Sequence, residues 1–112
     1  MLSRSLENVV NNALRVVPSP NGEVRVSIIE RGDKMVFLVD DNGPGVDPEV
    51  GEQIFDQDVT GRPDGQGLGL SLAKAVLVAH GGSIYYTDSP LGGTRFHMEL
   101  PMEDDTEDPS FA

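Results

Sequence analysis

Residues 65–80, GQGLGLSLAKAVLVAH, combine a glycine-rich loop with the start of an apolar helix. Gly65, Gly67 and Gly69 alternate with larger residues, and from Leu68 onward the apolar spacing is helical. Glycine lets a ligand approach the backbone closely, and a helix N-terminus offers unpaired N–H groups and a positive dipole end. Together these features predict a site for a phosphate-bearing ligand. A surface loop that happens to precede a buried helix is the alternative.

The length and composition are those of one soluble globular domain. The 112 residues are 38% hydrophobic and 24% charged, which is enough for a single core. The chain has no cysteine, which excludes disulfides and thiolate metal sites. The net charge of −11 argues against nucleic acid or an anionic membrane surface as a partner. No apolar run is long enough to span a bilayer, and the chain does not open with a signal-peptide pattern.

Acidic residues gather near the C-terminus. Residues 103–108, EDDTED, contain five of the nineteen acidic residues of the chain and no basic one. Such a run is typical of a solvated, disordered end. We therefore expect one folded domain over residues 1–102 and an acidic, disordered tail over residues 103–112.

Residues 3–17 have the spacing of an amphipathic helix. Asn8, Asn12 and Arg15 form a narrow stripe on the side opposite the apolar residues. Asparagine is a weaker helix former than Glu, Lys or Gln, so it is a poor choice for a plain solvent face. Amide oxygens can ligate Mg²⁺ or its waters, and arginine can hold a phosphate oxygen. The stripe predicts a contact face for these groups, with a merely solvated face as the alternative.

Two strands joined by a tight turn are predicted next, over residues 23–31 and 34–40. The second strand runs into residues 40–45, DDNGPG, where Asp41 could accept a hydrogen bond from an exocyclic amine. Gly43 and Gly45 would let a flat ring lie against the backbone. An ordinary Asp-Asn-Gly turn is the alternative. The spacing fits neither a calcium loop nor a dinucleotide fingerprint nor a P-loop.

The second half of the chain alternates helical and strand patterns. These patterns predict a short helix over residues 47–55 with Asp47 as its N-cap, followed by a loop over residues 56–66 that is long enough for a lid. A buried helix over residues 68–80 and two strands over residues 83–87 and 94–100 are predicted after it. Arg62 is the only base in the loop. The order of elements favours an α+β two-layer sandwich with helices on one face of a mixed sheet.

Five stretches together resemble the nucleotide-binding boxes of the sensor histidine kinase catalytic domain. In order they are Asn8–Ala13 (NVVNNA), Asp41–Gly45 (DNGPG), Ile54-Phe55, Gly65–Leu70 (GQGLGL) and Gly92-Gly93-Thr94. That domain belongs to the superfamily of DNA gyrase, the heat-shock chaperone of the same fold and the mismatch-repair ATPase. The match covers residues 2–101. It implies a Bergerat-type ATP-binding fold with an ATP pocket between the helices and the lid.

The resemblance also implies roles for the matching residues. Asn12 would help to hold Mg²⁺ with Asn8 assisting, and Arg15 would contact phosphate, so these three are the candidate catalytic residues. Asp41 would accept from the adenine amine, Thr94 would lie near adenine through water, and glycine backbone would cradle the phosphates. The full set that would bind ATP is Asp41, Gly43, Gly45, Gly65, Gly67, Leu68, Gly69 and Thr94.

One position separates the branches of this superfamily. In the hydrolytic members, the residue four before the Mg²⁺ asparagine is a glutamate that activates water, whereas this chain has Asn8, which lacks a basic carboxylate. Glu7 lies about 140° from Asn12 around a helix and should not substitute. Hydrolysis is therefore disfavoured. Transfer of the γ-phosphate to a histidine needs no such base, because the imidazole is itself the nucleophile.

We therefore expect the ATP-binding catalytic domain of a two-component sensor histidine kinase. It would donate the γ-phosphate of Mg-ATP to a histidine on a separate dimerisation domain, and indirectly to a response regulator. A catalytically degenerate nucleotide-binding module is one alternative, suggested by the short lid and by Asp58 where the family commonly has a second phenylalanine. An anti-sigma-type serine kinase is another, although those usually carry glutamate at the position of Asn8.

We expect the chain to begin inside the asparagine helix and to contain no phosphoacceptor helix. His80 and His97 are expected to serve structure instead. We expect an N-terminally truncated, monomeric fragment that binds nucleotide but does not phosphorylate itself. In its parent it would be a cytoplasmic domain of an inner-membrane-anchored protein, with no contact of its own to membrane or nucleic acid.

Overall fold

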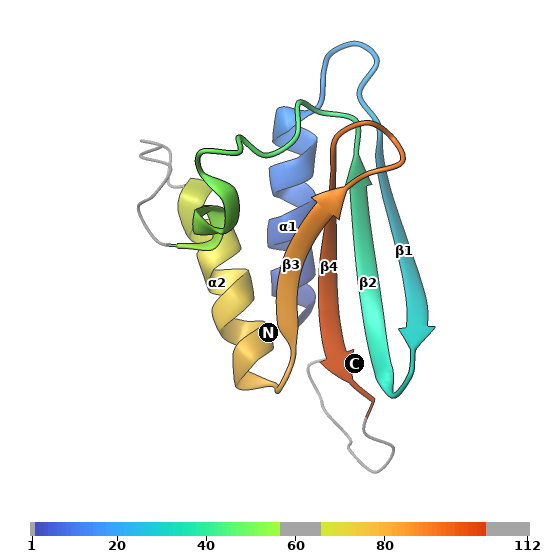
Figure 1. Ribbon diagram of the computed structural model, residues 1–112, viewed down its shortest axis with the longest axis vertical. Coiled ribbons are helices and arrows are strands. Elements are labelled where there is room, and N and C mark those ends of the chain that lie inside the picture. The colour runs from blue at the N-terminus through green and yellow to red at the C-terminus, as the bar shows by residue number, and fades with distance from the viewer. Residues whose placement is uncertain (1, 57–65, 103–112) are drawn as a thin grey trace.

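The computed structural model describes residues 2–56 and 66–102, which form two layers (Figure 1). Helices α1 (Leu2–Val16) and α2 (Gln66–Ala79) cover one face of a four-stranded sheet. Its strands are β1 (Val24–Arg31), β2 (Lys34–Asp41), β3 (Ser83–Asp88) and β4 (Thr94–Pro101). The two long helices and four strands confirm the predicted elements, with ends shifted by no more than two residues. No helix in the described ranges is long and apolar enough to cross a bilayer.

The sheet has the strand order β1-β2-β4-β3, and every described pairing in it is antiparallel. The expectation of a mixed sheet is therefore corrected. The crossover through α2 does make β3 run parallel to β2, as a helical connection normally does. However, β4 folds back from β3 and inserts between the two, so that it pairs antiparallel with both.

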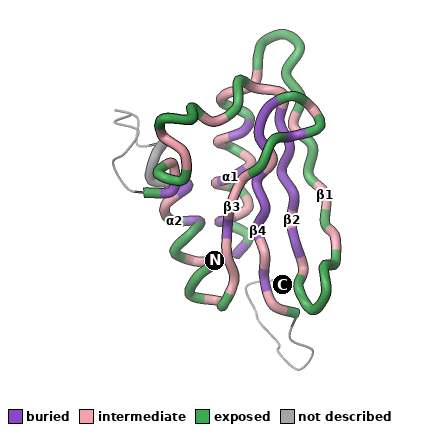
Figure 2. The backbone as a smooth tube through the Cα atoms, viewed as in Figure 1, coloured by how far each residue is buried: buried purple, intermediate pink, exposed green. Residues whose placement is uncertain are grey.

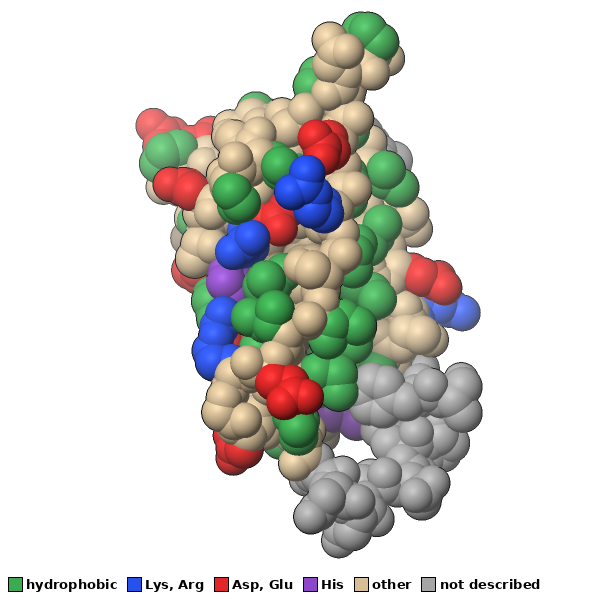
Figure 3. All heavy atoms as spheres, turned by 90° about the vertical axis from the view of Figure 1, so that its right-hand side faces the viewer, with side chains coloured by type: hydrophobic (Ala, Val, Ile, Leu, Met, Phe, Trp, Pro, Cys, Tyr) green, Lys and Arg blue, Asp and Glu red, His purple; other side chains and the backbone are tan. Residues whose placement is uncertain are grey.

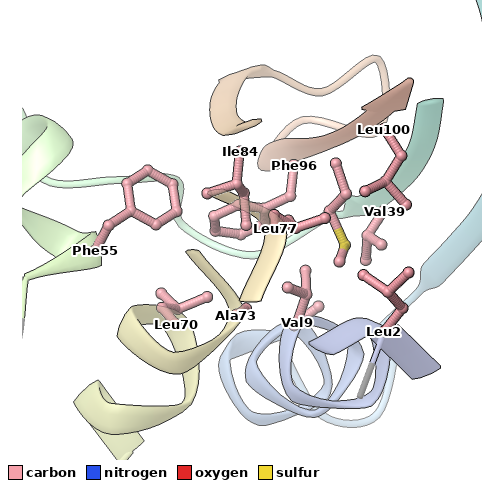
Figure 4. Close-up of a cluster of buried hydrophobic side chains, with 12 residues drawn as sticks. Leu2, Val9, Val39, Phe55, Leu70, Ala73, Leu77, Ile84, Phe96 and Leu100 are labelled. Carbon is pink, nitrogen blue, oxygen red and sulfur yellow. The ribbon is translucent and has the colours of Figure 1, made fainter. Parts of the chain in front are cut away.

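The core lies between the helices and the sheet (Figure 4). Because side chains alternate along a strand, Val39 of β2 faces the helices together with Phe96 of β4, which lies opposite it. Val9 of α1 and Leu77 of α2 are fully buried against this face. Phe55 lies at one end of the core, edge-on to Phe96 with 6.1 Å between ring centroids. Burial of side chains of this size contributes about 1.5–3 kcal/mol each.

The short helix before the lid differs from its prediction. It is a 3-10 helix, η1 (Gly51–Phe55), and Asp47 does not cap it. Instead the Asp47 carboxylate accepts the backbone N–H of Glu49 at 2.9 Å, and the Asp47 carbonyl accepts those of Val50 and Gly51. Gly51, the first residue of η1, has a φ of +55°, and this left-handed conformation lies where the Asp47 turn ends and the 3-10 helix begins. Phe55 is nevertheless buried, so the element is fixed to the core of the domain.

The face of the sheet away from the helices carries mostly polar side chains, although Val36 and Leu38 of β2 are buried on it. Figure 2 shows burial concentrated along β2 and β4, whereas β1 at the edge is largely exposed. On this outer face Arg31 of β1 donates to Glu99 at 3.1 Å and to Tyr85 at 2.9 Å, and Tyr85 donates to Glu99 at 2.7 Å. Seen from the β1 side, basic and acidic side chains lie next to one another (Figure 3). Cross-strand pairs of opposite charge therefore tie the exposed edge to the sheet.

Candidate functional site

Asp41, the last residue of β2, is a buried carboxylate with a defined orientation. Alternation along β2 places it on the helix side with Val39, and it is 1% exposed. Its Oδ1 accepts the backbone N–H of Gly43 at 2.9 Å and that of Thr94 at 3.2 Å. Both hydrogen bonds that the described residues make to this carboxylate end on Oδ1. Oδ2 is therefore left as an acceptor for a group that donates from the site.

Two glycines let the backbone close around this carboxylate. A Cβ on Gly93 would overlap Asp41 Oδ1 and would lie 2.6 Å from the Gly43 nitrogen. A Cβ on Gly43 would lie 3.0 Å from the carbonyl oxygen of Val16, at the end of α1. No side chain fits at Gly93 without moving backbone. The structure thus places Gly43 and Thr94, both predicted site residues, in direct contact with Asp41.

The asparagine stripe of α1 lies beside the start of α2. Asn8 and Asn12 are half-buried, and the phosphate-box residue Gly69 faces Asn8, since a methyl group there would lie 3.8 Å from Asn8 Cβ. Two boxes far apart in sequence therefore meet along one seam between the helices. Arg15 is exposed and donates from Nη1 to the carbonyl oxygen of Asn11 at 3.2 Å.

The remaining predicted site residues lie at the same end of the molecule. Gly45 follows the Asp41 turn with a φ of +85° and nothing within 4 Å of a Cβ there. Gly67 and Leu68 lie in the first turn of α2. The end of β2, the β3–β4 turn, the end of α1 and the start of α2 gather at one end of the fold (Figure 1). Gly65, Arg62, Asp58 and the acidic tail lie outside the described residues.

The donor set of this region fits Mg²⁺ bound together with a nucleotide. No group of three or more His, Asp or Glu side chains comes together as a metal site in residues 2–56 and 66–102. The available oxygens are the amides of Asn8, which lies beside Gly69 of α2, and of Asn12, one turn further along α1. The start of α2 is a helix N-terminus, which suits phosphate. Mg²⁺ usually takes few protein ligands and completes its shell with phosphate oxygens and water.

Sequence reasoning missed a second acidic site next to Asp41. Asp40 points to the outer face, where its carboxylate accepts from Arg95 and from the Ser89 hydroxyl. The hydrogen bond to Asp40 raises the pKa of Arg95 above its ordinary value. The only available signal was two consecutive acids at the end of a buried strand, because their side chains must point to opposite faces. The sequence does not identify Arg95 as the partner, since that depends on strand register.

Asn42 was also missed, although it lies inside the Asp41 box. Its side-chain oxygen accepts the N–H of Glu23 at 2.8 Å, and its amide donates to the carbonyl oxygen of Asn21 at 2.8 Å. Asn42 thereby fastens the loop after α1 to the end of β2. This contact links the helix that carries the asparagine stripe to the strand that carries Asp41.

The two histidines make internal contacts. His80, after the end of α2, has Nδ1 2.8 Å from the carbonyl oxygen of Val76. His97 of β4 has Nε2 2.8 Å from the Thr87 hydroxyl and stacks on Tyr85 with 4.4 Å between ring centroids. Burial lowers the pKa of His97 below its ordinary value, and the nearby charges of Arg31 and Arg95 lower it further.

Most of the chain is similar to known proteins. The family model described as histidine kinase-, DNA gyrase B- and HSP90-like ATPase matches residues 1–104. The sensor protein RstB of Escherichia coli K12 is 36% identical over 108 residues, which cover 91% of this chain and 24% of RstB. The chain therefore spans about a quarter of the length of this curated relative.

Two solved structures share this fold over most of the chain. The catalytic domain of the histidine kinase ThkA, in a nucleotide-free form, superimposes with a TM-score of 0.78 at 29% identity, covering 90% of this chain and 66% of that one. Full-length ShkA, crystallised with AMPPNP, superimposes with a TM-score of 0.76 at 31% identity, covering 89% of this chain and 21% of that one.

Proposed function

The chain belongs to the histidine kinase-, DNA gyrase B- and HSP90-like ATPase family, and on that premise we propose that its site binds Mg-ATP with adenine at Asp41 and the phosphates between α1 and α2. It corresponds to the ATP-binding catalytic domain of two-component sensor histidine kinases. The proposal concerns which of its residues hold the nucleotide, which metal accompanies the nucleotide, and where the phosphate goes.

The observation that carries the proposal is the orientation of the Asp41 carboxylate. Two backbone N–H groups hold Oδ1, so Oδ2 keeps one direction without a cost in side-chain entropy on binding. An acceptor in that position matches the exocyclic amine of adenine and opposes the carbonyl of guanine. The site should therefore select ATP over GTP. Thr94 and Gly43, which touch the carboxylate, would frame the base, and Gly45 next to them leaves open space for it.

The phosphates would lie along the seam between α1 and α2. The N–H groups at the start of α2 would receive them, and Gly69 leaves the backbone open beside Asn8. Asn12, with Asn8, would hold the Mg²⁺ ion, and Arg15 would reach a phosphate oxygen once its contact to Asn11 is released. The bound ion would neutralise charge on the phosphates during transfer.

The reaction that suits this site is phosphoryl transfer rather than hydrolysis. Asn8 provides no carboxylate to activate water. A neutral imidazole nitrogen of a histidine on the dimerisation domain would attack the γ-phosphorus and form a P–N bond. The bond between that phosphorus and the oxygen bridging to the β-phosphate would break and release ADP, and the imidazole would lose its N–H proton to water. A response-regulator aspartate would then receive the phosphate. In the parent protein, the domain would lie on the cytoplasmic side of an inner membrane.

A transfer assay with separate domains tests this proposal. The chain would be mixed with γ-labelled ATP, Mg²⁺ and the isolated dimerisation domain of its parent. We expect label on that domain in an acid-labile, alkali-stable form, as a phosphohistidine requires, and no label on the chain alone. Acid-stable label would indicate a serine kinase. Nucleotide binding without transfer to any acceptor would indicate a degenerate module, and stable label on the chain itself would also contradict the proposal.

A further inference from the structure

We infer that Asp40, Arg95 and Ser89 are positioning residues for the nucleotide site, acting on Asp41 from the opposite face of the sheet. The inference rests on the proposed role of Asp41 as the adenine acceptor. None of the three residues would touch the nucleotide. Their effect would reach Asp41 through the β3–β4 turn, residues 89–93, which contacts the end of β2 from both faces.

The first step is the anchor on the outer face. Asp40 and Arg95 lie opposite each other on β2 and β4. Arg95 donates to Asp40 in a bidentate manner, from Nε to Oδ1 at 2.7 Å and from Nη2 to Oδ2 at 3.2 Å. The Asp40 side chain is only 3% exposed, whereas that of Arg95 is 29% exposed. A planar, bidentate pair of this kind has one geometry, and it therefore orients the groups attached to it.

The second step is the hydroxyl of Ser89. It donates to Asp40 Oδ1 at 2.9 Å and accepts the backbone N–H of Leu91 at 3.0 Å. The Ser89 backbone closes the same turn, because its N–H donates to the Gly93 carbonyl at 2.9 Å and its own carbonyl accepts from Gly92 at 2.9 Å. The Ser89 side chain thus links the Asp40 carboxylate to the backbone hydrogen bonds that set the conformation of the turn.

On the helix side of the sheet, the same turn contacts Asp41. The Gly93 N–H donates to the Asp41 carbonyl at 3.1 Å, and the Thr94 N–H donates to Asp41 Oδ1 at 3.2 Å. The turn packs closely against Asp41 here, because even a Cβ on Gly93 would overlap Asp41 Oδ1. A shift of the turn would therefore tilt the carboxylate whose other oxygen is the proposed acceptor.

We expect the Asp40–Arg95 pair to contribute more to the orientation of Asp41 than to the stability of the fold. A buried ion pair is weak evidence for stability, because the cost of desolvating the two charges offsets their attraction. Here the pair lies at the residue next to Asp41 and shares a turn with it. A displacement of about 1 Å in a positioning contact can cost a binding site much of its strength.

The test compares affinity with stability in matched variants. Asp40→Asn and Ser89→Ala would be titrated with Mg-ATP by calorimetry, and their free energies of unfolding measured in urea. We expect the dissociation constant to rise about tenfold in each, as for the loss of one well-placed hydrogen bond. The backbone amide signals of Gly93 and Thr94 should shift in ¹H–¹⁵N spectra of the nucleotide-free variants.

Arg31→Ala is the matched control, because Arg31 forms another ion pair on the same face, with Glu99, and also donates to Tyr85. It should lower the free energy of unfolding yet leave the dissociation constant within about twofold. Unchanged affinity in Asp40→Asn and Ser89→Ala, or an equal loss in Arg31→Ala, would overturn the inference. If the parent chain does not bind Mg-ATP, or if Asp41→Asn binds it equally well, the proposed function fails instead.

Discussion

Asp40 and Asp41 are consecutive in the chain, but their carboxylates lie on opposite faces of the sheet. Asp40 is neutralised by Arg95 on the outer face, whereas Asp41 accepts only backbone N–H groups on the helix side, as far as the described residues go. The Asp40 carboxylate is fully occupied by its structural contacts, whereas the Asp41 carboxylate keeps one oxygen for a ligand. Both depend on the β3–β4 turn, so the buried ion pair and the candidate site share one support.

Asp41→Asn should abolish most of the ATP affinity and leave the fold intact. The asparagine oxygen can still accept from Gly43 and Thr94, but its amide then turns a donor toward the adenine amine. A mismatch of this kind costs about 1–3 kcal/mol, or roughly 10- to 100-fold in the dissociation constant measured by calorimetry. Asp47→Asn is the control, because Asp47 is an exposed turn residue that also accepts a backbone N–H. Equal affinity in Asp41→Asn and the parent would refute the acceptor role.

Gly69→Ala should separate stability from function. A methyl group there makes only an ordinary contact with Asn8, 3.8 Å away, and alanine is the better helix former. The free energy of unfolding should rise by up to about 1 kcal/mol. The affinity for Mg-ATP should fall about tenfold, because the methyl group would occupy space that a phosphate needs next to the backbone.

Gly93→Ala provides the contrast for Gly69→Ala. Its Cβ would overlap Asp41 Oδ1, so both stability and affinity should fall, the former by about 1–3 kcal/mol. Urea unfolding and calorimetric titration of both variants would check the pair. A Gly69→Ala variant that is more stable and binds ATP as tightly as the parent would place the phosphates elsewhere.

Asn12→Ala should weaken ATP binding only when Mg²⁺ is present. If the amide holds the ion, the dissociation constant with Mg²⁺ should rise about tenfold or more, while the value in a chelator stays unchanged. Asn11→Ala is the matched control, since Asn11 is the neighbouring, exposed asparagine of the same helix. Titrations with and without Mg²⁺ distinguish the two. A loss of affinity in Asn12→Ala that is the same in both conditions would argue against metal binding at Asn12.

Stability should fall as the pH drops below about 6.5, because of His97. Burial first, then the charges of Arg31 and Arg95, lower the pKa of this histidine in the folded state, while Glu99 and Asp40 oppose them with smaller effects. The unfolded chain therefore binds the proton more readily. Stability from this group is complete above the ordinary pKa of 6.5 and is lost as pH falls toward the lowered value.

Urea unfolding at about pH 7.5 and about pH 5.5 measures this effect of His97. In His97→Gln the difference between the two conditions should shrink, because the titrating group is gone. The same loss of stability on acidification in the variant and the parent would assign the effect to other residues.

Local sequence patterns were sufficient to predict the helices and strands and which residues each of them contains. The spacing of apolar residues identified α1, α2 and all four strands, because helix and strand periods differ and each element buries one face. The stretches around Asn12, Asp41 and Gly69 were predicted to bind a nucleotide because glycine and amide groups suit phosphate, Mg²⁺ and a flat base, and this role stays a prediction. That Asp47 does not cap the short helix was not predictable in the same way, since Gly51 adopts a left-handed conformation that only the folded chain shows.

The sequence by itself determined which segments form helices and strands and which residues have the chemistry to bind a nucleotide. Only the tertiary structure decided that β4 lies between β2 and β3, and this placement sets Arg95 opposite Asp40 and Thr94 beside Asp41. The physical reason for this difference is the distance along the chain over which each interaction acts. Propensity and periodicity act within a few residues, whereas strand order and register follow from packing the whole apolar face against α1 and α2.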